Sequence, residues 1–274
     1  MVDVGKELSG QTDLIDGAGN TVPVLTPASD DKILQDAFIS LGLIPHHTVH
    51  IGQRLLPIGM EGLEPSGDLD FPERTILGGA SVAGVRGYGD VRDLGIQVDG
   101  NWTDVSYSVG VYNGEGPNAS EENDSKDFAA RVVTTPTDWL HLGASVYSGE
   151  IGENELTRDR AGAEVAIEQD NYFIKGEYGR GKDDDTKSDG WYVSTGYWFE
   201  DLSAFDIPFD LLAAVRYEQF DPDTDNSGDD ITAPTVGLSM LLAEHNSKIQ
   251  FSYSHYDFET DDDDLFIAAF QVAF

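Results

Sequence analysis

The chain has 274 residues, 39% of them hydrophobic, no cysteine, and a formal net charge of -35 at pH 7. Such an acidic chain repels the phosphates of nucleic acids, and the missing thiols exclude disulfides and cysteine metal sites. No apolar run reaches about 18 residues, which excludes a transmembrane helix but leaves open a membrane β-barrel, whose strands are only half apolar. The first residues lack the basic and apolar regions of a signal peptide, so we expect that a signal has been removed.

Residues 1–30 are polar and predict a terminal segment or loop, whereas residues 31–274 predict one β-barrel domain. From residue 31 onward, apolar and polar residues alternate in segments of about ten, as in strands between two different environments. Thirteen strands are predicted, near 32–43, 47–57, 93–101, 104–113, 127–135, 139–148, 159–168, 171–180, 190–199, 209–220, 232–242, 248–257 and 264–274.

The connections between these strands alternate between two classes. Short ones fall at 45–46, 101–103, 136–138, 169–170 and 243–246, with a somewhat longer one at 200–208. Long acidic ones fall at 58–92, 114–126, 149–158, 181–189, 221–231 and 258–264. Short turns at one end and long loops at the other are typical of outer-membrane barrels. The fold class is therefore predicted as all-β, a transmembrane antiparallel β-barrel, with loop 58–92 turning inward because it is too long for an ordinary connection.

Aromatic residues near strand ends agree with a membrane barrel. The tryptophans at 102, 139, 191 and 198 fall where aromatic girdles meet the two membrane interfaces. Phe266, Phe270, Val272 and Phe274 share one face of the last strand. A terminal phenylalanine resembles the signal that barrel-assembly machinery reads, although an ordinary apolar strand can also end a chain in this way.

Five segments, in order, resemble the phosphate-selective porin O and P family of Gram-negative outer membranes. They are GQRLLPIGMEGLEPSGDLDFPER (52–74), VRDLGIQVDG (91–100), YSVGVYNGEG (107–116), SKDFAARVVTTP (125–136) and LHLGASVYSG (140–149). The resemblance covers 47–274 and implies a sixteen-stranded barrel, a trimer, and passage of anions such as phosphate. Against sixteen strands, the thirteen predicted here imply a chain truncated at its N-terminus, because an open barrel leaves unpaired edges in lipid.

Charged residues in the polar phase of the strands are the candidate pore-lining groups: Arg54, Arg131, Lys175, Arg216, Glu164, Glu168, Glu177 and Glu218. The arginines and the lysine could contact passing anions. The alternative is that the same cations pair with the glutamates and only hold the wall in shape. The constriction loop carries Arg74, Arg86 and Arg92 among seven carboxylates, which departs from the basic constriction of the family.

The sequence contains candidates for two other kinds of site. Asp221, Asp223 and Asp225 alternate as in a calcium loop, but Thr232 stands at the twelfth position, where such loops carry glutamate. The calcium hypothesis is therefore weak, and a solvated acidic loop is the alternative. No catalytic motif occurs, and Ser254 and His255 point to opposite faces of one strand, so no enzyme and no cofactor is predicted.

These observations predict an outer-membrane porin, a passive diffusion channel for small hydrated solutes or ions. Its expected partners are outer-membrane lipid, the solutes, and two further copies in a homotrimer. The alternative from another class is a secreted, acidic, soluble β-protein that binds calcium or carbohydrate.

Overall fold

The computed structural model describes residues 2–4, 14–15, 21–22, 34–120, 123–200, 209–242, 247–258 and 261–272. Almost all regular structure in these ranges is β, with one 3-10 turn, η1 (Glu61–Leu63). None of the helices in the described ranges has the length and hydropathy needed to cross a lipid bilayer. The strands are β1 (Val2–Val4), β2 (Leu14–Ile15), β3 (Thr21–Val22), β4 (Leu34–Ile44), β5 (His47–Leu55), β6 (Ser81–Val82), β7 (Val85–Arg86), β8 (Arg92–Asn101), β9 (Val105–Tyr112), β10 (Asp127–Thr137), β11 (Leu140–Ile151), β12 (Leu156–Gln169), β13 (Tyr172–Asp183), β14 (Thr186–Phe199), β15 (Asp210–Asp221), β16 (Ile231–Leu241), β17 (Ser247–Phe258) and β18 (Asp261–Val272).

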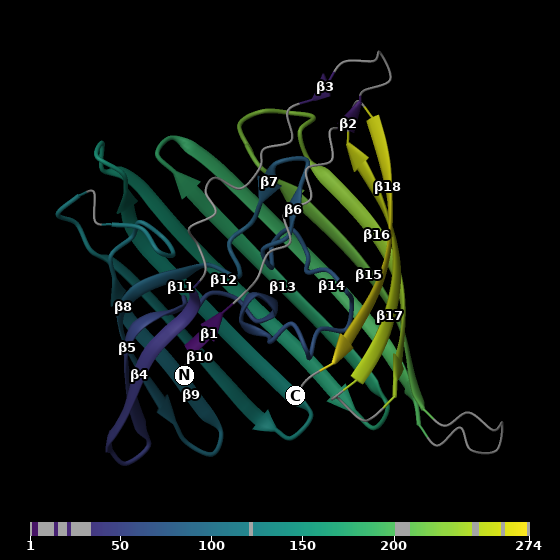
Figure 1. Ribbon diagram of the computed structural model, residues 1–274, viewed down its shortest axis with the longest axis horizontal. Coiled ribbons are helices and arrows are strands. Elements are labelled where there is room, and N and C mark those ends of the chain that lie inside the picture. Colours follow the sequence, from purple (N-terminus) through teal and green to yellow (C-terminus); the bar gives the residue numbers. More distant parts are fainter. Residues whose placement is uncertain are drawn as a thin grey trace.

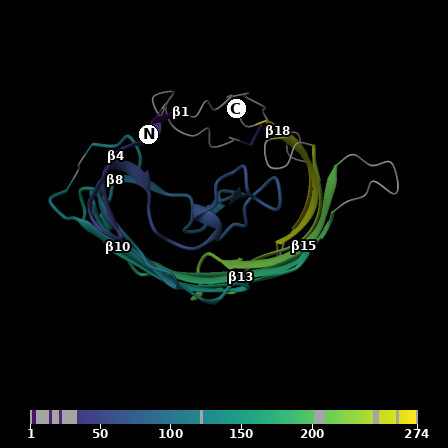
Figure 2. The same ribbon diagram turned by 90° about the horizontal axis from the view of Figure 1, so that it is seen from below.

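Fourteen of these strands form one antiparallel sheet in the order β1-β4-β5-β8-β9-β10-β11-β12-β13-β14-β15-β16-β17-β18. Apart from β1, each strand pairs with the sheet strands before and after it in the chain, so the sheet is a continuous meander (Figure 1). Seen from its end, the sheet curves into a deep arc with β1 and β4 on one side and β18 on the other (Figure 2). The described strands do not close the barrel, because β1 and β18 are not paired.

All thirteen predicted strands are present, and β1 adds a fourteenth that was too short to show a period in the sequence. The long loops predicted at 149–158, 181–189 and 258–264 are wrong. At the first two the strands continue, and only the turns 152–155 and 184–185 separate them. At the third, β17 continues to Phe258 and β18 begins at Asp261, which pairs with Phe258. A β-hairpin can contain polar residues wherever both of its faces meet water. An acidic segment in the sequence therefore does not by itself show where a strand ends. Residues 201–208, 243–246 and Phe274 lie outside the described ranges.

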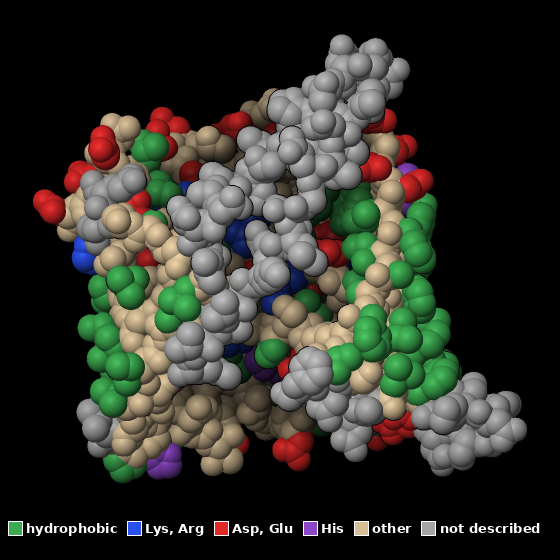
Figure 3. Space-filling model, viewed as in Figure 1, with side chains coloured by type: hydrophobic (Ala, Val, Ile, Leu, Met, Phe, Trp, Pro, Cys, Tyr) green, Lys and Arg blue, Asp and Glu red, His purple; other side chains and the backbone are tan. Residues whose placement is uncertain are grey.

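The two faces of the sheet differ in burial, as the alternation predicts. On β15, Leu212, Arg216 and Phe220 are buried, whereas Val215 and Tyr217 are about half exposed. Large exposed hydrophobic side chains occur on β4, β5 and every strand from β8 to β18, and they gather along the flanks of the molecule (Figure 3). A soluble monomer rarely exposes so extended an apolar surface, whereas a lipid-facing barrel requires it.

Residues 56–91, called the inserted loop below, lie inside the arc (Figure 2). The amide of Leu56 donates to the carbonyl of Val91 at 2.8 Å, which closes the neck of the loop. Among the described residues, the loop supplies five of the thirteen buried side chains of the main apolar core, and the inner face of the sheet supplies the other eight. The core residues from the loop are Leu56, Ile58, Ile76, Leu77 and Tyr88, and those from the sheet include Tyr112, Tyr147, Tyr192 and Phe220.

Candidate functional site

The start of the inserted loop is held by one buried carboxylate on β13. Glu177 Oε2 accepts from the Met60 amide at 2.8 Å, and Oε1 accepts from the Glu61 amide at 2.6 Å and from the Tyr192 hydroxyl at 2.8 Å. Three hydrogen bonds therefore converge on one buried carboxyl group of the sheet. Glu177 thus fixes the place where the loop enters the lumen.

The middle of the loop is held by an ionic network on β15. Arg216 is 3% exposed, and its Nη1 lies 3.5 Å from Glu61 Oε1 and donates to the Glu73 carbonyl at 3.0 Å. Its guanidinium lies 4.7 Å from the centre of the Phe71 ring. Glu218 accepts from the Ile76 amide at 2.7 Å. Arg216 and Glu218 of β15 therefore both bind the loop.

A third set of contacts holds the loop at Leu69 and Asp70. Lys248 Nζ donates to the Leu69 carbonyl at 2.9 Å, and Gln250 Nε2 donates to the same carbonyl at 3.1 Å. Lys175 Nζ lies 2.8 Å from Asp70 Oδ2 and 3.4 Å from Glu64 Oε1. The loop is thus attached to strands on both sides of β15.

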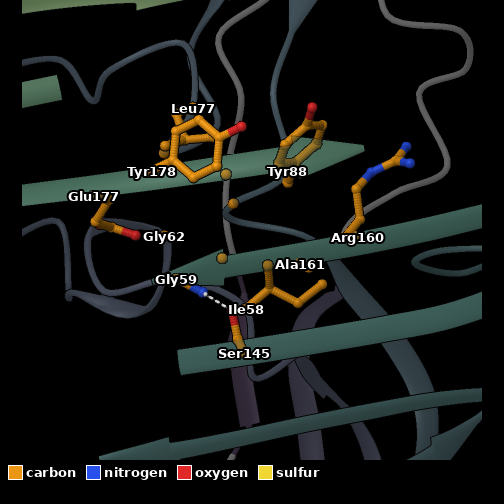
Figure 4. A pocket seen from close by; sticks show the side chains of 14 residues that line it. Ile58, Gly59, Gly62, Leu77, Tyr88, Ser145, Arg160, Ala161, Glu177 and Tyr178 are labelled. Carbon is orange, nitrogen blue, oxygen red and sulfur yellow. Dashed lines mark hydrogen bonds between the residues drawn. The ribbon is translucent and has the colours of Figure 1, made fainter. Parts of the chain in front are cut away.

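Glycines let the loop approach itself and the sheet closely (Figure 4). A Cβ at Gly62 would lie 2.6 Å from the Cα of Gly89, so the two passes of the loop could not stay in contact. A Cβ at Gly179 of β13 would lie 2.7 Å from Leu77 Cδ1. The crevice that remains between loop and sheet measures about 20 Å³, enough for about one water molecule. The loop therefore packs tightly on this side of the lumen.

The three predicted constriction arginines lie at the loop, but their donors bind nearby groups. Arg74 Nη2 donates to the Glu64 carbonyl at 2.7 Å, and Nη1 donates to the Glu61 carbonyl. Arg86 Nε donates to the Gly79 carbonyl at 2.9 Å. Arg92 is the first residue of β8 and pairs with Asp36 at 3.1 Å and Asp90 at 2.9 Å.

Arg54 and Arg131 each pair with a carboxylate on a nearby strand. Arg54 Nη1 lies 3.2 Å from Asp99 Oδ2, which also lies 3.0 Å from His50 Nε2. Arg131 binds both oxygens of Glu164, with Nε donating to Oε2 at 3.1 Å. The same carboxylate lies 2.8 Å from the His141 ring. These contacts favour the alternative in which wall cations pair with wall carboxylates.

Burial raises the pKa of ionisable groups on the loop itself. It raises the pKa of Glu64 to about 6, although the nearby Lys175 ammonium opposes the shift. It also raises the pKa of Glu73, opposed by Arg216 and Arg74, and raises the pKa of Tyr88 to about 12. With a pKa of about 6, the Glu64 carboxyl changes its charge as the pH rises through that value.

Comparison with known proteins gives a consistent result. The model of the phosphate-selective porin O and P family matches residues 11–162, which is more than half of the chain. The chain belongs to the phosphate-selective porin O and P family. It forms an outer-membrane porin channel, and its family and fold indicate a channel rather than an enzyme. Neither supports the soluble, secreted alternative. No curated protein matched the chain.

Three solved structures share the fold of this porin at low sequence identity. OmpT of Vibrio cholerae has a TM-score of 0.53 at 12% identity, covering 82% of this chain and 70% of OmpT. A porin refined at 1.8 Å has a TM-score of 0.52 at 12% identity, covering 86% of this chain and 81% of that porin. OccK11 (OpdR) of Pseudomonas aeruginosa has a TM-score of 0.50 at 11% identity, covering 86% of this chain and 69% of OccK11.

The structure of the porin does not bring Asp221, Asp223 and Asp225 together as a calcium site. Asp221 accepts from the Asp223 amide at 3.1 Å, and Asp223 accepts from the Asp225 amide at 3.2 Å, so these carboxylates cap their own turn. In the described ranges no three acidic, histidine or cysteine side chains lie close enough to hold a metal ion.

Sequence reasoning missed several residues that position the loop of the porin. Lys248 and Gln250 lie in the buried phase of β17, and Tyr192 lies in the buried phase of β14. A lysine in the phase that faces the lumen was a usable signal for Lys248. Glu61 could not be found in this way, because the loop has no regular alternation from which the direction of its side chains could be predicted.

Proposed function

We propose that this porin is a diffusion channel that passes small hydrated cations in preference to anions, with the inserted loop narrowing its lumen. The observation that carries this proposal is the charge of the loop. Residues 56–91 hold six carboxylates and two arginines, and both arginines donate to carbonyls of the loop itself. Glu61, Glu64, Asp70 and Asp90 pair with cations of the wall. Asp68 and Glu73 have no ion pair among the described residues, so the loop presents its negative charge to a passing ion through these two, and carboxylates that line a pore favour cations.

The candidate pore-lining cations support the same proposal. Arg54, Arg131, Lys175 and Arg216 each have at least one carboxylate partner within 3.5 Å. A cation held by a carboxylate has little attraction left for phosphate. We therefore do not carry the phosphate preference of the family over to this chain, whereas a homotrimer remains the expected assembly.

The reversal potential in a planar bilayer under a potassium chloride gradient tests this proposal. We expect a potential with the sign of cation preference, because mobile cations are concentrated near the loop carboxylates. The double substitution Asp68→Asn and Glu73→Gln removes two charges of the loop and should lower the preference for potassium over chloride about two-fold or more, with screening by salt limiting the effect.

Asp185→Asn is the matched control, because it removes one carboxylate from the turn between β13 and β14 instead of from the lumen. It should leave the reversal potential close to that of the unmodified protein. An anion-selective potential in the unmodified protein would overturn the proposal and restore the anion preference of the family.

A further inference from the structure

A cavity of about 410 Å³ lies between the inserted loop and the turn that joins β10 to β11. The loop contributes Leu63 and Glu64, and the turn contributes Asp138 and Trp139. The strands β12 and β13 contribute Glu168 and Lys175 to its lining. The cavity thus has space for a small organic molecule, and none of the contacts described above fills it.

Some of the charged side chains around this cavity are already paired within the protein, and others are free to bind a ligand. Lys175 is held by Asp70 at 2.8 Å and by Glu64 at 3.4 Å. His141 is held by Glu164 at 2.8 Å. In the described part of the chain, neither Glu168 nor Asp138 has an ion-pair partner or a side-chain hydrogen bond. The Lys175 ammonium and the His141 ring are therefore both engaged, and the available charge is negative.

The remaining lining is mostly apolar and aromatic, with Thr135 as its one uncharged polar residue. Leu63 and Met60 line the cavity from the loop, and Ala166 lines it from the inner face of β12. Trp139 adds an indole ring, the aromatic group that attracts cations most strongly. A ligand that combines a short apolar chain with a planar cation would satisfy all three kinds of surface, since a guanidinium also binds carboxylates through two parallel hydrogen bonds.

We propose that this cavity is a binding subsite for small organic cations of the alkylguanidinium or alkylammonium class. The cation binds Glu168 and Asp138 beside the Trp139 ring, and the alkyl chain packs against Leu63 and Met60 of the loop. This inference rests on the proposed function, because it names a class of solute that the same channel takes up. The subsite lies beside the short turn 138–139, whereas the proposed cation preference depends on carboxylates of the inserted loop.

Block of the potassium current by butylguanidinium tests the subsite, with butylurea as an uncharged analogue of nearly the same shape. We expect butylguanidinium to block the unmodified channel and butylurea to block at least ten-fold more weakly. Glu168→Gln and Trp139→Leu should each raise the half-blocking concentration of butylguanidinium by about ten-fold. Equal block of the unmodified channel and of Glu168→Gln would overturn the proposal, as would the absence of any block.

Glu200→Gln is the matched control, because Glu200 follows β14 at the same end of the barrel and does not line the cavity. It should leave the block unchanged. The reversal potential of each variant separates the two proposals. Glu168→Gln should keep the cation preference that the loop confers while it loses the block. A channel that prefers anions yet shows the block would contradict only the proposed function.

Discussion

Glu64 and Asp70 share the Lys175 ammonium, but burial affects the Glu64 carboxyl strongly enough to raise its pKa to about 6. The unfolded chain releases this proton near pH 4.5, so the docked loop binds the proton more tightly than the unfolded chain. The resulting stabilisation is complete below pH 4.5 and is lost as the pH rises through about 6. It amounts to about 2 kcal/mol.

Glu64→Gln should therefore change the stability of the docked loop in a pH-dependent way. Relative to the unmodified protein, the variant should gain up to about 2 kcal/mol between pH 4.5 and pH 7, because it does not bury a charge. Hydrogen exchange of loop amides at both pH values measures this difference. Asp68→Asn, which removes an exposed carboxylate from the same loop, is the control. An identical difference at the two pH values would contradict the assignment.

The inserted loop is the element whose position depends most on single side chains. Glu177→Ala should release its start, because the amides of Met60 and Glu61 lose their acceptor, at a cost of about 1–3 kcal/mol per bond. We expect faster proteolysis and faster hydrogen exchange near residues 59–63. Glu164→Ala is a close control, since Glu164 is also buried in the wall but binds Arg131 and His141 instead of the loop. Equal loop protection in the two variants would argue against the anchoring role.

Strands and loop differ in how far the sequence predicts them. The thirteen strands could be predicted because one face of each strand meets lipid, and apolar residues therefore recur at every second position along it. Ile174 and Val236 are examples, since both are apolar and about half exposed. The alternation also placed Arg216 and Glu177 on the lumen face. It could not supply their partners, since a period of two defines a face but not the atoms opposite it. The strand extensions around turns 152–155 and 184–185 could not be predicted, because both faces meet water there and the sequence shows no alternation of apolar and polar residues.

At the scale of the whole molecule, the exposed apolar side chains form the surface that fits a bilayer. Val215 lies near the middle of β15 and is 50% exposed. Val215→Arg should destabilise the protein folded into lipid vesicles by about 2–4 kcal/mol, the range for a cation at the midplane of a barrel. Urea titration of folding into vesicles measures the loss. Asp185→Arg, in a turn beyond the lipid, should cost less than about 1 kcal/mol, and equal losses would place Val215 outside the membrane.

The attachment of the loop also orders the events of assembly. Its hydrogen bonds connect residues separated by 86 positions at Gly59 and Ser145, and by 181 positions at Leu69 and Gln250. Contacts between such distant residues form late, because the intervening chain must first be in place. The carbonyl of Leu69 has no side-chain donor until β17 has joined the sheet. The loop can therefore gain its full set of attachments only after β17 has joined the sheet, later than its attachments to Glu177 on β13 and to Arg216 on β15.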